Sequence, residues 1–267
     1  MRLIILLLSF CLAVPALAET VQLGDRYYDI CLPADPDGAP VILALHGGGG
    51  NPDQFATASG LGQKASKAGY AVIFPAGSGR RGDRLLTWNG GYCCGYAARR
   101  NVDDLWFLTQ VIADAADRFG VAGDRVYLTG MSNGSIMAET FAAEYPDRTH
   151  AVAGVSGTMD TASFRVKGQV PALIIHGTAD PMVPYDGGKG DQSLTRTDFA
   201  SVASVVDAFL APWGGGLTQT DRTIDRKDDG TSVTVTDYQQ GNRVVLRLMT
   251  VTGGAHHWPG GLKVRLS

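Results

Sequence analysis

Ser132 is the first residue whose surroundings suggest chemistry. It lies in the segment LTGMSNGSIM, between Gly130 and Gly134, with the spacing Gly-x-Ser-x-Gly. The apolar residues 126–129 before it predict a buried strand, and the pattern of residues 135–145 after it predicts a helix. A serine on a sharp strand-to-helix turn projects its hydroxyl at the carboxyl edge of a sheet, as in a nucleophile elbow. The context therefore predicts a nucleophile at Ser132 rather than an ordinary tight turn.

A nucleophilic serine needs a base, and the base needs an acid that fixes its tautomer. The segment GGAHHWPG, after the last predicted strand, supplies His256, with His257 beside it as the alternative. Asp180 follows another predicted strand, and its alternative role is that of a turn residue because Pro181 comes next. The chain order Ser132, Asp180, His256 is the α/β-hydrolase order, so we predict these three as a catalytic triad. The other histidines are predicted to be structural or surface residues: His46, His150 and His176.

Acyl transfer also needs two hydrogen-bond donors for the oxyanion that forms during attack. The backbone N–H of Asn133, the residue after the serine, is one predicted donor, with that of Met131 as the alternative. The segment LHGGGGN supplies the other, because its glycines let backbone N–H groups approach a ligand closely. Gly48 is the predicted donor, with Gly47 next, and His46 would orient the loop. A phosphate-binding loop is the poorer interpretation, because the lysine and the spacing of that motif are absent.

Short apolar runs alternate with helical patterns along the chain, which predicts an α/β fold. The runs lack polar alternation, as is typical of strands buried on both faces of a parallel sheet. They lie at 41–45, 71–74, 126–129, 151–155 and 172–175, with an edge strand at 27–32 and a late β pair at 233–238 and 244–251. Helices are predicted at 53–68, 103–119, 135–145 and 198–210. We expect a doubly wound, mostly parallel sheet with helices on both faces, which brings the residues that follow the strands to one edge.

The beginning of the chain predicts export. Residues 1–18 combine the basic Arg2, an apolar run and the small-x-small end Ala16-Leu17-Ala18, which is the layout of a secretory signal. The run is shorter than the roughly 20 apolar residues that span a bilayer. We therefore expect one domain over residues 19–267 of the 267-residue chain, exported to the periplasm or the cell exterior, with no membrane span.

The charge balance argues against nucleic acid as a partner. The chain has 23 Lys and Arg against 26 Asp and Glu, a net charge of −3. Removal of residues 1–18 takes Arg2 away, and 22 minus 26 gives −4. A mildly acidic chain with scattered basic residues has no basic footprint for a phosphate backbone.

Three cysteines remain after residue 18: Cys31, Cys93 and Cys94. Export makes disulfides possible, and an odd number allows at most one bridge within the chain. Because adjacent cysteines pair with each other only with strain, we expect Cys31 to pair with Cys93 or Cys94. No Cys-x-x-Cys or His-x-x-x-His spacing predicts a metal site.

Six segments together make the chain resemble the secreted esterases that include polyhydroxybutyrate depolymerases and feruloyl esterases. They are LHGGGGN, WNGGYCCG, NVDDLWFL, GMSNGS, HGTADPMVPY and GGAHHWPG, and the resemblance covers about residues 27–261. It implies an α/β-hydrolase fold and a serine ester hydrolase without a metal or organic cofactor. Ser132 would be the nucleophile, Asp180 the orienting acid and His256 the base.

The resemblance carries two further expectations. It implies that Trp88 and the Cys93–Cys94 segment lie at the mouth of the active site, where Trp88 would contact substrate. The sequence pattern alone also fits Trp88 as a core residue. Such esterases also continue after WPGG with a closing helix, whereas this sequence ends six residues after Gly261. We therefore expect apolar sheet surface next to His256 to be left uncovered.

The leading interpretation is a secreted serine esterase that acts on a small-molecule or polymeric ester. Polyester and feruloylated polysaccharide both remain open as substrates, since the choice depends on the loops 78–98 and 185–197. The alternative is a non-catalytic carbohydrate- or polymer-binding module that retains the hydrolase fold. A peptidase on the same fold is a third interpretation.

Overall fold

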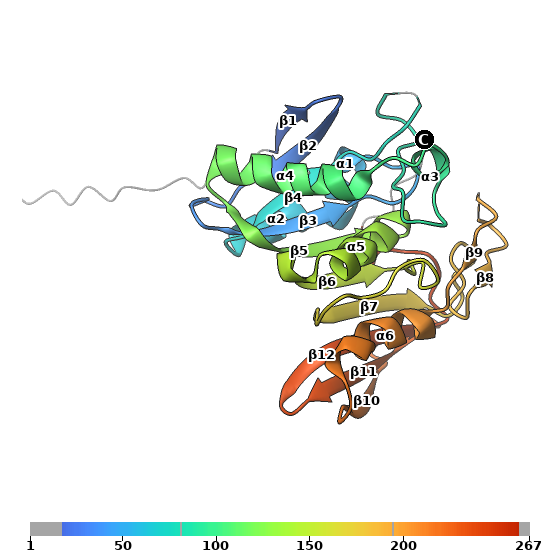
Figure 1. The fold of residues 1–267 in the computed structure, drawn as a ribbon. Coiled ribbons are helices and arrows are strands. Elements are labelled where there is room, and N and C mark those ends of the chain that lie inside the picture. Colours follow the sequence, from blue (N-terminus) through green and yellow to red (C-terminus); the bar gives the residue numbers. More distant parts are fainter. Residues whose placement is uncertain (1–17, 81, 194, 262–267) are drawn as a thin grey trace, which may run out of the picture.

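The computed structural model describes residues 18–80, 82–193 and 195–261. The expected secretory signal, apart from Ala18, lies outside these residues. In the described part of the chain, ten strands form one sheet in the order β1-β2-β4-β3-β5-β6-β7-β12-β11-β10 (Figure 1). The strands are β1 (Glu19–Leu23), β2 (Arg26–Cys31), β3 (Pro40–Leu45), β4 (Ala71–Pro75), β5 (Ala122–Met131), β6 (Thr149–Val155), β7 (Ala172–Gly177), β10 (Thr218–Ile224), β11 (Ser232–Gln240) and β12 (Arg243–Thr252).

The centre of the sheet is parallel, as predicted. Strands β4, β3, β5, β6, β7 and β12 pair in parallel, while β1, β2, β10 and β11 add antiparallel pairs at the two sides. The long apolar runs form the central strands because both of their faces are covered over much of their length. The carboxyl ends of β3, β5, β7 and β12 therefore meet at one edge of the sheet.

Helices cover both faces of the sheet (Figure 1). On one face, α4 (Asp104–Phe119), α5 (Asn133–Glu144) and α6 (Val202–Leu210) pack on the main hydrophobic core. On the other, α1 (Pro52–Ser59) and α2 (Leu61–Lys67) pack on a smaller core over β3 and β4. The remaining short elements are α3 (Gly95–Arg99), the two-residue strands β8 (Gly188–Lys189) and β9 (Asp198–Phe199), and the 3₁₀ turns Pro146–Arg148 and Ala211–Trp213.

The face that carries α1 and α2 is open beyond these helices. A hollow of about 480 Å³ lies over β5, β6, β7 and β12. Its walls include Tyr127, Ala153, Leu173 and Val244, and Trp258 reaches it from the last loop. In the part of the chain that the structure describes, apolar side chains thus line a hollow on this face of the sheet. Residues 262–267, which follow the WPGG segment, lie outside the described residues.

Several boundaries differ from the sequence-based expectation. Residues 27–32 were expected at the edge of the sheet, but β2 is its second strand because β1 pairs outside it. The helix expected over 53–68 is two helices, since Gly60 adopts φ 60° between them. The helix expected from residue 198 begins after Ser201, whose side chain accepts the Ser204 N–H and caps it. The strand β10 was not expected.

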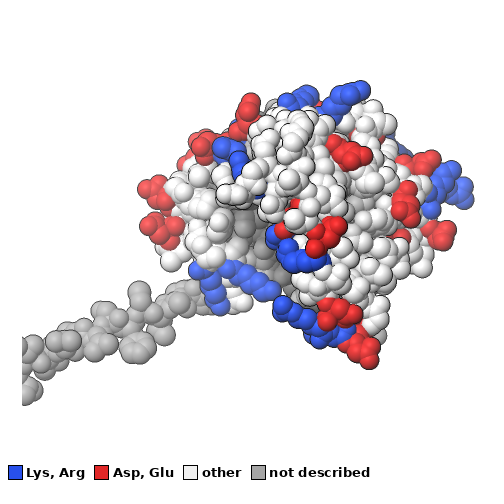
Figure 2. Space-filling model, turned by 90° about the horizontal axis from the view of Figure 1, so that it is seen from below, with Lys and Arg blue, Asp and Glu red and all other residues white. Residues whose placement is uncertain are grey.

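The outer surface carries charges of both signs. On the face that Figure 2 shows, Lys and Arg side chains are interspersed with Asp and Glu side chains and with wide uncharged areas.

Candidate active site

Ser132 lies on a sharp turn between β5 and α5, as predicted. Its backbone has φ 57° and ψ −124°, a conformation that costs a non-glycine residue energy and persists only where its surroundings enforce it. The Ser132 N–H donates to the Val155 carbonyl over 2.8 Å, and the Ser132 carbonyl accepts the Ile136 N–H over 3.0 Å. A Cβ added at Gly130 would collide with the backbone of Gly134 across the turn, and one added at Gly134 would collide with the backbone of Leu45 and His46 at the end of β3. The two glycines of the motif therefore permit the turn.

Asp180 and His256 form a direct pair. His256 Nδ1 lies 2.7 Å from Asp180 Oδ2, and Asp180 Oδ1 accepts the N–H groups of Met182 and Val183 over 2.9 and 3.0 Å. Burial raises the pKa of Asp180, but the bonds from His256 and the two amides outweigh it and hold that pKa below its ordinary value. The carboxylate is therefore charged and accepts the Nδ1 proton, which leaves Nε2 of His256 as the basic nitrogen.

The adjacent histidine has a different position. His257 is exposed, whereas His256 is half-buried against a carboxyl group that is itself buried. In the described residues, the histidines near the Asp180 carboxylate are His256 and, over 3.6 Å, the buried His176. Of the two neighbouring histidines, His256 is thus the one that is oriented by an acid.

Strand pairing brings the triad candidates to one edge. Ser132 follows β5, Asp180 follows β7 and His256 follows β12, and these strands belong to the same parallel region. The loops after β7 and β12 are tied together, since the Thr178 N–H donates to Val251 and the Ala179 N–H donates to Gly254. Among the described residues no hydrogen bond joins His256 to Ser132, a gap that is common before substrate binds.

The glycine-rich loop after β3 lies directly against the serine turn. An added Cβ on Gly47 would be 3.6 Å from Cβ of Ser132, and one on Gly48 would be 3.4 Å from Cβ of Asn133. Within the described part of the chain, the Gly48 N–H donates to no other protein group. Asn133 begins α5, where the first backbone N–H groups have no partner within the helix. The two predicted oxyanion donors, Gly48 and Asn133, are therefore neighbours.

His46 fixes the position of this loop. Its Nε2 accepts the Gly77 N–H over 2.9 Å, so the proton resides on Nδ1, which lies 2.8 Å from the Gly47 carbonyl and donates to it. Burial lowers the pKa of His46 to about 4, so the ring is neutral and keeps this tautomer at neutral pH. The structural role expected for His46 agrees with these contacts.

Trp88 was expected to contact substrate, and the structure corrects this. Its side chain is fully buried, and its indole N–H donates to the His46 carbonyl over 3.0 Å. The side chain of Asn133 bonds both the N–H and the carbonyl of Trp88, over 2.7 and 2.9 Å. Trp88 therefore holds the glycine-rich loop after β3 and the start of α5 together from within the core.

The expected pairing of Cys31 is also wrong. Cys93 and Cys94 are joined to each other, and Cys31 is a free, buried thiol. Cys31 ends β2 and packs in the small core beneath α1 and α2 with Val72 and Phe74. Cys93 and Cys94 lie instead near Ser132, so the two regions are on different parts of the molecule.

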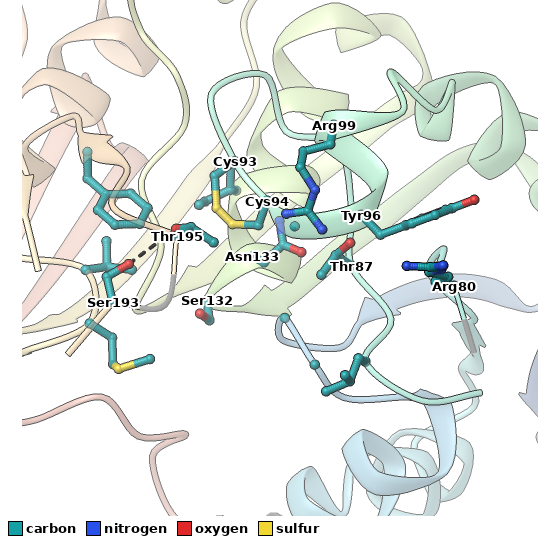
Figure 3. A pocket seen from close by; sticks show the side chains of 18 of the residues that line it. Arg80, Thr87, Cys93, Cys94, Tyr96, Arg99, Ser132, Asn133, Ser193 and Thr195 are labelled. Carbon is teal, nitrogen blue, oxygen red and sulfur yellow. Dashed lines mark hydrogen bonds between the residues drawn. A yellow bond between two sulfur atoms is a disulfide. The ribbon is translucent and has the colours of Figure 1, made fainter. Parts of the chain in front are cut away.

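A pocket of about 400 Å³ opens beside Ser132 (Figure 3). Its walls come from the turn itself, from residues 80–99 and from residues 182–199. These segments overlap the two loops expected to control specificity. In Figure 3, Cys93, Cys94 and Asn133 lie on the wall above Ser132, and Ser193 and Thr195 lie to one side.

Glu139 is a buried residue that sequence reasoning missed. It lies on α5 two turns after Ser132, where it accepts the Ser135 hydroxyl over 3.1 Å and the Met159 N–H over 2.8 Å. Complete burial raises the pKa of Glu139 to about 8, although the two hydrogen bonds act to lower it. No sequence signal distinguishes it, because a glutamate in a helix is ordinarily on the surface.

The described residues offer neither a cluster of metal ligands nor a membrane-spanning helix. There, no group of three or more His, Cys, Asp and Glu side chains is placed to hold a metal ion. In the same residues, no helix is long and apolar enough to cross a membrane.

The chain is similar to known esterases. Residues 27–164 match the family described as "Esterase PHB depolymerase". The chain is 33% identical over 256 residues to "Putative esterase NocK" of Nocardia uniformis subsp. tsuyamanensis, covering 86% of this chain and 68% of that protein. It is 28% identical over 230 residues to "Probable feruloyl esterase C" of Aspergillus niger, covering 75% and 80%.

A solved structure shares the fold. The acetyl xylan esterase from Aspergillus awamori superposes with a TM-score of 0.59 at 15% identity, over 93% of this chain and 95% of that one. The α/β-hydrolase fold predicted from the sequence is confirmed.

Proposed function

This chain belongs to the PHB depolymerase esterase family and is a carboxylic ester hydrolase, and we propose that it works through Ser132, His256 and Asp180. The observation that carries the proposal is the shared sheet edge. Ser132, with its strained backbone, follows β5 there. Asp180 follows β7, and His256, which it orients, follows β12. No second function has a specific observation in its favour.

The proposed reaction follows from the geometry. His256 Nε2 takes the proton of the Ser132 hydroxyl as the oxygen attacks the ester carbonyl. The N–H groups of Gly48 and Asn133 stabilise the tetrahedral oxyanion. His256 then protonates the leaving alcohol, and water attacks the acyl-enzyme by the reverse sequence of proton transfers. Asp180 keeps the imidazole in the reactive tautomer and stabilises its charged form.

The substrate and location are parts of the same proposal. Relatives are named for feruloyl and acetylxylan esters, and the matching family for a polyester. We propose that this protein cleaves a small or polymeric ester of that range. The layout of residues 1–18 supports export to the periplasm or the cell exterior.

Turnover of p-nitrophenyl butyrate tests the proposal. Ser132→Ala should lower kcat/KM by on the order of 10⁴- to 10⁶-fold, because the chemical step loses its nucleophile. The matched control is Ser163→Ala, at an exposed serine, which should keep wild-type turnover. Unchanged turnover in Ser132→Ala would reject the proposal. Retention on xylan or polyester without any turnover would favour a binding module.

A further inference from the structure

Three arginines line the pocket beside Ser132. They are Arg80, Arg84 and Arg99, and all three are exposed. No aspartate or glutamate is among the described residues that line this pocket. Within the same described residues, none of the three guanidinium groups forms an ion pair or a hydrogen bond. The chain as a whole is acidic, with a net charge of −3, so this pocket is a local concentration of positive charge.

The backbone holds two of these arginines beside the oxyanion loop. Arg80 and Arg84 belong to a loop whose base is closed by reciprocal 2.9 Å hydrogen bonds between Ser78 and Thr87. The Gly49 N–H donates to the Leu86 carbonyl over 2.7 Å, which joins this loop to the glycine-rich segment.

Arg99 approaches from a different element. It ends the short helix α3, and in Figure 3 its side chain is directed from α3 toward Asn133. The start of that helix is held because the Ala97 N–H donates to the Thr87 hydroxyl over 3.0 Å. The three positive charges therefore come from two anchored segments that face one space.

The other walls of the pocket are apolar. Ile136 and Val183 are buried and line it together with Met182 and Phe199. A ligand that fits these walls carries an apolar body, and the arginines favour an anionic group on that body. Guanidinium binds carboxylate through parallel charge-assisted hydrogen bonds, which a neutral group does not offer.

We propose that the preferred substrate is an ester that bears a free carboxylate, which Arg80, Arg84 and Arg99 bind while the ester carbonyl meets Ser132. This inference rests on the proposed esterase function and narrows its substrate class. Because the arginines are exposed, each ion pair between an arginine and the substrate carboxylate contributes modestly to the binding free energy and is screened by salt.

Two p-nitrophenyl esters of equal chain length test the inference. The adipate monoester carries a free carboxylate, and the hexanoate carries a methyl group in its place. The measured quantity is the ratio of the two kcat/KM values, adipate over hexanoate, after subtraction of enzyme-free hydrolysis. We expect a ratio above one that falls in 0.5 M NaCl. It should fall about fivefold in Arg99→Gln and more than about tenfold in the triple variant Arg80→Gln, Arg84→Gln, Arg99→Gln.

The control variant is Arg100→Gln, which removes the same charge from an exposed arginine that does not line the pocket. Its ratio should equal that of the wild type. Turnover of both esters that depends on Ser132, with a ratio unaffected by the arginine variants, would overturn this inference and leave the esterase function standing. Absence of turnover of both esters would overturn the two together. An equal fall in Arg100→Gln would also reject the pocket as the source of the preference.

Discussion

At the scale of single residues, one hydrogen bond decides which histidine can act as base. Asp180 accepts the proton of His256 Nδ1 over 2.7 Å, so His256 Nε2 is the nitrogen available for proton transfer. His257 is exposed and makes no ion pair with Asp180 among the described residues. Sequence position alone left the two histidines as alternatives, because they are adjacent on one glycine-rich loop.

The two histidines should respond differently to truncation. His256→Ala should lower kcat/KM for p-nitrophenyl butyrate by at least about 10³-fold, since the base and its link to Asp180 are both lost. His257→Ala should change it by less than about threefold, because the side chain points to solvent and lacks the acid. Steady-state kinetics of the two variants side by side make the comparison. The opposite ranking would assign the base to His257.

The sequence predicted the position of a residue well where a neighbouring strand determines that position. Ser132 comes three residues after the apolar run 126–129 and Asp180 five residues after the run 172–175, so strand position predicted that both lie near the carboxyl edge of the sheet. Trp88 was misassigned because an aromatic residue in a motif has the same signal whether it lines a pocket or lies beneath it. The Cys93–Cys94 pair was missed because only the backbone path shows that Cys31 lies in a separate core.

At the scale of elements, the serine turn depends on close approach of β3 to α5. Gly134 lies against the carbonyl oxygens of Leu45 and His46, and a Cβ there would overlap both. Any side chain at this position would push the serine helix away from the oxyanion loop. The motif glycine is thus a packing requirement as well as a conformational one.

Gly134→Ala should therefore destabilise the protein by about 3 kcal/mol, measured as the free energy of unfolding in urea. The control is Gly215→Ala, where no atom lies within 4 Å of the added Cβ and the backbone conformation is ordinary. That variant should stay within about 0.5 kcal/mol of the wild type. Equal stabilities of the two variants would contradict the tight packing of the turn.

The elements themselves were predictable where burial on both faces produced continuous apolar runs. The central strands and α4 and α5 were found within a few residues of their bounds. The polar strand β10, exposed along nearly its whole length, has no such run and was missed. The late β pair was predicted, but its parallel pairing with β7 was not, because pairing partners far apart in the chain leave no local pattern.

At the scale of the whole molecule, the buried Glu139 should make the free energy of unfolding depend on pH. Its folded-state pKa is about 8, above the unfolded value of 4.5, so the folded protein holds a proton that the unfolded chain releases. The contribution of this bound proton to the free energy of unfolding is fully present below pH 4.5 and is lost as the pH rises to 8. Asp180 acts with the opposite sign, because its lowered pKa makes stability decline in acid.

Glu139→Gln should remove this pH dependence, since the amide resembles the protonated acid and can still bond Ser135 and the Met159 N–H. Between pH 5 and pH 8, the wild type should lose roughly 3 to 4 kcal/mol more unfolding free energy than the variant. Urea unfolding at both pH values gives the numbers. Glu144→Gln, at a partly exposed glutamate paired with Lys167, serves as the control. Identical pH profiles for the wild type and Glu139→Gln would show that the carboxyl is ionised in the fold.

At the same scale, the charge of the pocket beside Ser132 could not be predicted from the sequence. The cluster of Arg80, Arg84 and Arg99 was not expected, because net charge says nothing about how two separate loops combine their side chains around one pocket.

Reaction with a fluorophosphonate tests the central claim most directly, because the probe modifies a serine only where a base and an oxyanion site activate it. Peptide mapping by mass spectrometry should find one adduct per chain, on the peptide that contains Ser132. The adduct should be absent in Ser132→Ala and should form far more slowly in His256→Ala. No adduct on the folded wild type, or an adduct on another serine, would contradict the proposed triad.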